Sequence, residues 1–251
     1  MLAWNLASDR LGALPYKTLT KETGEFALRL LVLTLAISPL ARLWHWPRLL
    51  KLRRIVGVTC AGYGFAHLAA FTTDKGVAIG VVGNEILARP YLTIGAIALT
   101  TLMILAGTSF DAAVRKLGSR RWRRLHRLAY LAGALALAHF AMQSKLGGQA
   151  AILTGLFALL MFYRLLPART SGSGSFAALC LVAALVTAGA EASYVGLTSG
   201  LSGWRVLEAN LDFVVGPRPA GVVLGLGLGV ATVAAVLDGL RAHRMRAVSR
   251  A

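Results

Sequence analysis

The amino-acid sequence predicts an all-α fold, a polytopic transmembrane helix bundle with about seven spans. The chain has 251 residues, of which 57% are hydrophobic and only 15% are charged, and its mean hydropathy is +0.65. Apolar stretches close to the roughly 20 residues that cross a hydrocarbon core of about 30 Å recur along it, separated by short polar breaks. Basic residues gather in alternate breaks. This composition excludes an ordinary soluble enzyme.

Seven apolar stretches are long enough to be spans. In chain order the predicted spans are Phe26–Leu43, Ile55–Phe71, Pro90–Phe110, Leu125–Met142, Ala150–Leu166, Phe176–Thr198 and Ala220–Leu240. Residues 1–25 precede the first span and lack the basic and apolar regions of a cleavable signal peptide, so we expect a short periplasmic tail. Within it, residues 9–25 fit either an interfacial amphipathic helix or a plain polar lead-in.

A Gly/Ser-rich linker at residues 170–175 divides the chain into two predicted modules. The first, residues 26–169, contains five spans. The second, residues 176–251, contains the last two spans and a basic tail. In the last span glycine recurs every fourth residue from Gly221 to Gly229. This small-residue seam permits close helix contact, and we expect it to pack against the other spans.

The charges of the breaks predict the orientation of the chain in a membrane. Seventeen basic residues fall in the segments predicted to lie inside: Arg42, Arg48, Lys51, Arg53, Arg54, Arg115, Lys116, Arg120, Arg121, Arg123, Arg124, Arg164, Arg169, Arg241, Arg244, Arg246 and Arg250. The alternate segments carry mixed charges. Because positive loops stay in the cytoplasm, we expect a periplasmic N-terminus and a cytoplasmic C-terminus. This topology accounts for the net charge of +17 with membrane lipid as the partner and no nucleic acid.

Three of the five histidines fall within or at the ends of apolar spans, where ionisable groups are costly and usually functional. His45, between two tryptophans, and His243, in the basic tail, are expected to be interfacial or surface residues. The other three are His67, His126 and His139. Any one of these alone could be a hydrogen-bonded packing residue. Their positions relative to one another are more informative than any single histidine.

His126 and His139 are separated by 13 residues, or about 20 Å along one helix, so they are expected near opposite membrane faces. His67 stands near the outer end of the second span, which runs parallel to the fourth, so His67 and His139 can share a level. Two imidazoles facing each other across a helix pair suit a haem iron. His126 is then available for a second haem or another partner. Arg54, at the equivalent position on the second span, could pair with a haem propionate.

The same segments resemble the MsrQ (YedZ) family of the ferric-reductase-like transmembrane superfamily. The resemblance extends from about Asp9 to about Leu166, and its motifs follow one another in order. They are Thr34-Leu-Ala-Ile-Ser-Pro-Leu-Ala-Arg42, Leu52-Arg-Arg-Ile-Val-Gly57, Phe65-Ala-His67-Leu, Arg89-Pro-Tyr-Leu-Thr-Ile-Gly95, Lys116-Leu-Gly118, Trp122-Arg-Arg-Leu-His126-Arg-Leu-Ala-Tyr130 and Ala138-His139-Phe140. The family usually has a further helix before the Asp9 segment, and its core does not require the last two spans.

The resemblance implies an electron-transfer subunit of the bacterial inner membrane that is not itself the catalytic subunit. One or two b-type haems would be bound through His67, His126 and His139, and FMN is also linked to the family. Electrons would come from the quinone pool or a cytosolic flavin reductase. They would pass to a periplasmic molybdopterin subunit that repairs methionine sulfoxide in oxidised proteins.

Two alternatives remain open at this point. One is a transmembrane ferric or cupric reductase with a separate flavoprotein donor, and the other is a cofactor-free transport or structural protein. Cys60 and Cys180 lie in apolar stretches and are expected to be core residues. Glu191 lies inside the sixth span. It could line a proton or quinone path, reach the interface, or bond to Tyr194 or Thr187 on its own helix.

Overall fold

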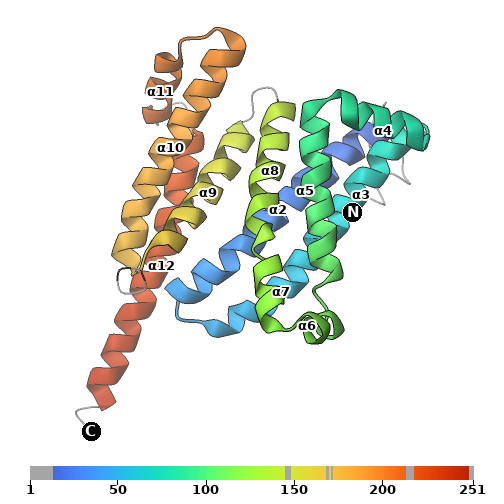
Figure 1. Ribbon diagram of the computed structural model, residues 1–251. Helices are drawn as coiled ribbons and strands as arrows, with labels where there is room; N and C mark the ends of the chain where they lie inside the picture. Colours follow the sequence, from blue (N-terminus) through green and yellow to red (C-terminus); the bar gives the residue numbers. More distant parts are fainter. Residues whose placement is uncertain (1–13, 145–147, 168–169, 171, 213–217, 249–251) are drawn as a thin grey trace. The chain divides into compact units, whose positions relative to one another are not determined.

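A computed structural model describes residues 14–144, 148–167, 170, 172–212 and 218–248. The described residues form helices joined by short turns, which confirms the all-α prediction (Figure 1). Seven helical segments among them are long and apolar enough to cross a membrane: Pro15–Leu43, Pro47–Asp74, Pro90–Gly107, Ser119–Gln143, Gly148–Leu165, Ser173–Ser199 and Pro219–His243. The chain is a multi-pass membrane protein, as predicted.

The helix ends differ from the predicted span ends where polar residues continue a helix. Helix α2 (Pro15–Leu43) begins well before Phe26, so the described part of the predicted tail is helical. Its first turns contain Thr20 and Thr23, whose hydroxyls donate to carbonyls within the same helix. Helix α10 (Ser173–Ser199) likewise takes in the last residues of the predicted linker. Hydropathy finds the apolar part of a helix and misses such polar ends.

The described residues also include five shorter helices, which hydropathy alone does not find because none is long enough to cross a membrane. Three of them connect candidate spans: α4 (Ile79–Ala88), α6 (Asp111–Leu117) and α11 (Gly203–Leu211). The other two, η1 (Pro47–Lys51) and α7 (Ser119–Leu125), form the first turns of the second and fourth candidate spans. Gly200 ends α10 with a φ of 68°, a left-handed conformation that glycine adopts at low cost and that turns the chain toward α11.

The predicted fourth span is interrupted at His126. Helix α7 ends at Leu125, and α8 (Leu128–Gln143) begins after a turn. The N–H groups of Arg127 and Tyr130 donate to carbonyls three residues earlier, which is the tighter 3₁₀ pattern. The expectation that His126 and His139 lie on one uninterrupted helix is therefore wrong, although both belong to the same candidate span.

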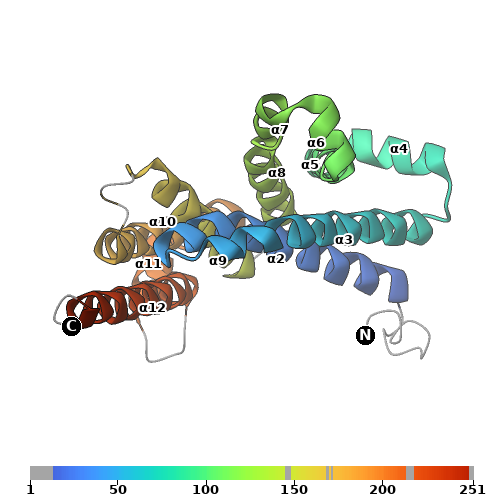
Figure 2. The same ribbon diagram turned by 90° about the horizontal axis from the view of Figure 1, so that it is seen from below.

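The chain forms two compact units, and α2 belongs to both. Unit 1 comprises residues 1–35 and 51–143. Here α3 (Leu52–Asp74) lies beside the first part of α2 (Figure 2), and α5 (Pro90–Gly107) packs against α8 (Figure 1). One buried cluster joins these four helices through Leu31, Cys60, Leu102 and Ala132. The Cys60 thiol donates to the carbonyl of Ala27, so this cysteine is a core residue, as predicted.

Unit 2 comprises residues 36–50 and 144–251. Helices α9 (Gly148–Leu165), α10 and α12 (Pro219–Val248) pack together, and Figure 1 shows α10 beside α12. Their core includes Tyr163, Phe176, Cys180, Val223 and Ala234. The contacts thus place α9 with the last two spans, whereas the predicted modules divide after residue 169; that modular division stays a prediction.

Two glycines of the expected seam, Gly225 and Gly229, do not lie on the face of α12 that packs against α10. A Cβ added at Gly225 or Gly229 would meet nothing within 4 Å, whereas one at Gly227 would lie 2.5 Å from Sγ of Cys180. Gly227 therefore makes the close contact with α10. Glycines spaced by four residues share one side of α12, whereas the opposite side, with Gly227, packs against α10.

Candidate cofactor site

His67 and His139 face each other within unit 1, on α3 and α8. Their ring centroids are 6.3 Å apart and the ring planes are nearly perpendicular, at 80°. Both side chains are half-buried. The structure therefore brings together the two histidines that the sequence predicted to share a level, and it does so although they are 72 positions apart in the chain.

The backbone of a neighbouring helix holds each of the two imidazoles. Nδ1 of His67 lies 2.7 Å from the carbonyl oxygen of Thr20 on α2, and Nδ1 of His139 lies 2.8 Å from that of Tyr91 on α5. A carbonyl oxygen only accepts, so each Nδ1 carries the proton and donates it. In a neutral imidazole the lone pair then lies on Nε2. Both rings thus present the nitrogen that can bind a metal.

A glycine four residues after each carbonyl makes room for the ring. Gly24 follows Thr20 and Gly95 follows Tyr91 at this spacing. A Cβ at Gly24 would lie 2.7 Å from Nδ1 of His67, and a Cβ at Gly95 would lie 2.8 Å from Nδ1 of His139. Such distances are too short for a methyl group. Sequence reasoning missed both glycines, although Gly95 stands in a motif that carries the family resemblance.

His126 is held differently, at the junction of α7 and α8. Its Nε2 lies 3.3 Å from the hydroxyl of Thr108, and its ring stacks on Trp122 with centroids 4.0 Å apart. The Thr108 hydroxyl donates to the carbonyl of Ile104 at 2.8 Å, so we assign Nε2 of His126 as the donor to Thr108. Nε2 of this histidine is therefore occupied, in contrast to the other two.

Arg54 pairs with a carboxylate of its own unit. Its guanidinium donates to Asp111 at 2.7 Å, and both side chains are exposed. The Arg54 hydrogen bond and charge hold the pKa of Asp111 below its ordinary value. The predicted pairing of Arg54 with a haem propionate stays a prediction.

The donor set fits a haem better than a bare metal ion. The described residues contain no group of three or more histidine, cysteine, aspartate or glutamate side chains able to hold a metal ion. A porphyrin supplies four nitrogens itself, so its iron needs only axial ligands. His67 and His139, whose ring centroids are 6.3 Å apart, would supply such ligands.

Comparison with known proteins supports the same class of protein. Residues 23–138 match the family described as the ferric reductase like transmembrane component. This match covers α3, α5 and most of α8, and it includes His67 and His126 but ends one residue before His139.

Curated relatives of the chain carry the name protein-methionine-sulfoxide reductase haem-binding subunit MsrQ. The chain is 42% identical to that of Azospira oryzae over 55% of this chain and 60% of the relative. It is 38% identical to that of Caulobacter vibrioides over 69% of this chain and 84% of the relative. It is 39% identical to that of Yersinia pseudotuberculosis over 66% of this chain and 86% of the relative. No solved structure matches the chain significantly.

Proposed function

Because the chain belongs to the MsrQ family of the ferric-reductase-like transmembrane proteins, we propose that it is a haem-binding electron-transfer subunit of a protein-methionine-sulfoxide reductase system. The single observation that carries the proposal is the facing pair of His67 and His139, each with Nδ1 bonded to a backbone carbonyl. In this proposal the chain carries electrons for a catalytic partner.

In the proposed site, His67 and His139 hold a b-type haem through their Nε2 atoms. The sequence has no C-x-x-C-H motif for covalent attachment, which favours a haem held by coordination alone. When bound, the haem supplies an iron that gains and loses one electron at a time. The chain's own residues orient the two imidazoles, and the carbonyls of Thr20 and Tyr91 raise their basicity by accepting the Nδ1 protons.

His126 and Arg54 are expected near the opposite membrane face from His67 and His139. A second haem at that level would take His126 as a ligand and Arg54 as a propionate partner. The hydrogen bond from His126 Nε2 to Thr108 and the ion pair from Arg54 to Asp111 would both have to open first. The pair of His67 and His139 has no such requirement. We therefore propose one haem at that pair as the primary site.

The family resemblance and the predicted orientation support a proposal for the donor and the acceptor. Electrons would enter from the quinone pool or a cytosolic flavin reductase, with FMN as a possible intermediate cofactor. They would leave to a periplasmic molybdopterin subunit, and two one-electron transfers would supply one methionine sulfoxide reduction. The basic loops support this direction because they favour an inner position for the His126 level.

The proposal is tested with the purified full chain in liposomes. A quinol is supplied, and methionine is recovered from an oxidised protein by the molybdopterin partner on the other side. We expect recovery with the wild-type chain and none with His67→Ala. Fast reduction of a ferric chelate, without any effect of the molybdopterin partner, would instead favour the ferric reductase alternative that the family description suggests.

A further inference from the structure

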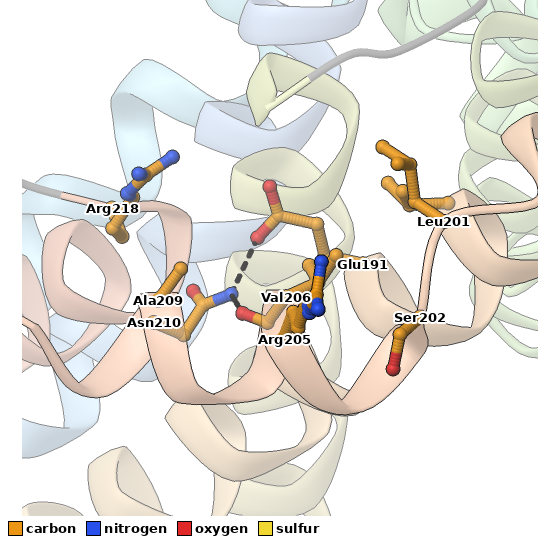
Figure 3. Close-up of a pocket in the computed structure, with 9 residues that line it drawn as sticks. Glu191, Leu201, Ser202, Arg205, Val206, Ala209, Asn210 and Arg218 are labelled. Atoms are coloured by element: carbon orange, nitrogen blue, oxygen red, sulfur yellow. Dashed lines mark hydrogen bonds between the residues drawn. The ribbon is translucent and has the colours of Figure 1, made fainter.

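A second site lies within unit 2. A cavity of about 330 Å³ opens beside α11, between the end of α10 and the start of α12 (Figure 3). Polar residues that line it are Glu191, Ser202, Arg205, Asn210 and Arg218. The rest of its wall is apolar and includes Val195, Leu201 and Val206. The cavity therefore combines charged groups with a hydrocarbon surface.

A buried asparagine builds this cavity by joining three helices. The Asn210 side chain is only 3% exposed. Its Nδ2 donates to Glu191 on α10 at 2.9 Å and to the carbonyl of Val206 at 3.0 Å. Its Oδ1 accepts from the N–H of Ala220 on α12 at 3.3 Å. Glu191 thus bonds to Asn210. The sequence suggested Tyr194 or Thr187 as its partner, and it did not indicate Asn210. The cavity wall is fixed by these bonds.

The charges in the cavity are arranged for a ligand that carries both signs. Among the residues that the structure describes, neither Arg205 nor Arg218 forms an ion pair. Glu191 uses one carboxylate oxygen for Asn210, and Figure 3 shows the other directed away from it. Two guanidinium groups are good partners for a phosphate. The remaining carboxylate oxygen is an acceptor for an ammonium or hydroxyl group.

The position of the cavity indicates where such a ligand comes from. Helices α10 and α12 are candidate spans, so the α11 segment that joins them lies at a membrane surface. Its Trp204 is 66% exposed, and Leu197 and Leu201 beside it are 88% and 61% exposed. Exposed tryptophan and leucine at a span end are typical of the membrane interface. The cavity therefore opens where phospholipid headgroups are concentrated.

We propose that this cavity binds the headgroup of a phosphoethanolamine lipid. The phosphate lies against Arg205 and Arg218, and the ammonium group donates to the free oxygen of Glu191. The apolar wall takes the first carbons of the lipid chains. Guanidinium groups and apolar surface together favour a lipid over free phosphate, and Glu191 favours an ammonium headgroup over an anionic glycerol headgroup.

Native mass spectrometry of the full chain, released from nanodiscs of defined lipid, tests this site. We expect retained phosphatidylethanolamine in the wild type and about tenfold less in the double variant Arg205→Gln/Arg218→Gln. The control Arg120→Gln/Arg121→Gln removes the same charge from exposed positions on α7 and should retain lipid as the wild type does. Equal retention in both double variants would overturn the site.

The Glu191→Gln variant tests the headgroup assignment. We expect it to lose the preference for phosphatidylethanolamine over phosphatidylcholine, whose trimethylated nitrogen has no N–H to donate, and over phosphatidylglycerol. If the wild type shows no such preference, the ammonium contact is wrong. If inorganic phosphate at about 10 mM, roughly ten times a millimolar Kd, displaces the lipid, the site binds free phosphate and the lipid proposal fails.

Discussion

At the scale of single residues, Gly24 and Gly95 control where the imidazole rings of His67 and His139 lie. Each glycine stands one helical turn after the carbonyl that accepts the Nδ1 proton. The missing side chain lets the ring approach the helix backbone. These two glycines are positioning residues, because they lie against the histidine rings.

Gly95→Ala is expected to move His139 and weaken haem binding about tenfold or more, as loss of a supporting contact to a metal ligand often does. The added methyl group would lie 2.8 Å from Nδ1, so the ring must shift. Haem per protein and the midpoint potential measure the effect. Gly62→Ala on α3 is the matched control, because its Cβ meets nothing within 4 Å. Unchanged potential and haem content in Gly95→Ala would refute the positioning role.

The ion pair of Arg54 and Asp111 gives a pH-dependent prediction. The folded state lowers the pKa of Asp111 below its ordinary value. Its contribution to stability is therefore present above the unfolded pKa of about 4 and lost as the pH falls through the lower folded value. Because both groups are exposed, we expect a small effect that salt weakens.

The melting temperature of Asp111→Asn checks this sign. It should fall slightly below that of the wild type at neutral pH, and the gap should close at pH values well below 4. A gap that widens on acidification would contradict the assignment of the ion pair.

At the scale of helices, unit 2 depends on close packing at two glycines. Gly227 of α12 lies against Cys180 of α10, and Gly155 of α9 lies against Thr187 and Val223. Cys180 and Thr187 are both fully buried. The three helices therefore meet where small residues let their backbones approach.

Gly227→Ala should destabilise unit 2 by about 1–3 kcal/mol, the usual cost of overpacking. Gly229→Ala is the control on the same helix, since its Cβ would meet nothing within 4 Å. That control should be neutral or slightly stabilising, because alanine favours helix by about 1 kcal/mol over glycine. Thermal unfolding in detergent separates the two variants, and equal melting temperatures would show that this contact does not hold α10 to α12.

Hydropathy predicted the seven spans because the membrane requires long apolar helices, and histidine spacing predicted that His67 and His139 share a level. The break at His126 and the hydrogen bond of His126 to Thr108 could not be predicted in the same way. The hydrogen bond is a contact with the C-cap residue of α5, which no local pattern encodes. Thr20 with Gly24 on α2 and Tyr91 with Gly95 on α5 show the same spacing of four residues. Their contacts with the two histidines become visible only when the helices are packed.

At the scale of the whole molecule, the basic breaks predict how the chain is oriented. They favour a cytoplasmic position for the segment that contains α6 and α7 and a periplasmic one for α11. Cys60 and Cys180 are 1% and 0% exposed, so the native cysteines should give little background to labelling.

Single added cysteines test the orientation in intact cells. We expect Ser202→Cys to react with a membrane-impermeant maleimide and Ser119→Cys to react only after the cells are opened. Both serines are exposed in the structure, so access to the reagent depends on the side of the membrane. The reverse pattern would show that the N-terminus is cytoplasmic and that electrons would have to flow the other way.

The most direct measurement is the dithionite-reduced minus oxidised absorbance spectrum of the purified chain and its histidine variants. We expect b-type Soret and α bands that His67→Ala and His139→Ala abolish, that His126→Ala only diminishes, and that the exposed-histidine control His45→Ala leaves unchanged. A fully reconstituted wild-type chain without haem bands, or bands that survive the loss of both His67 and His139, would contradict it.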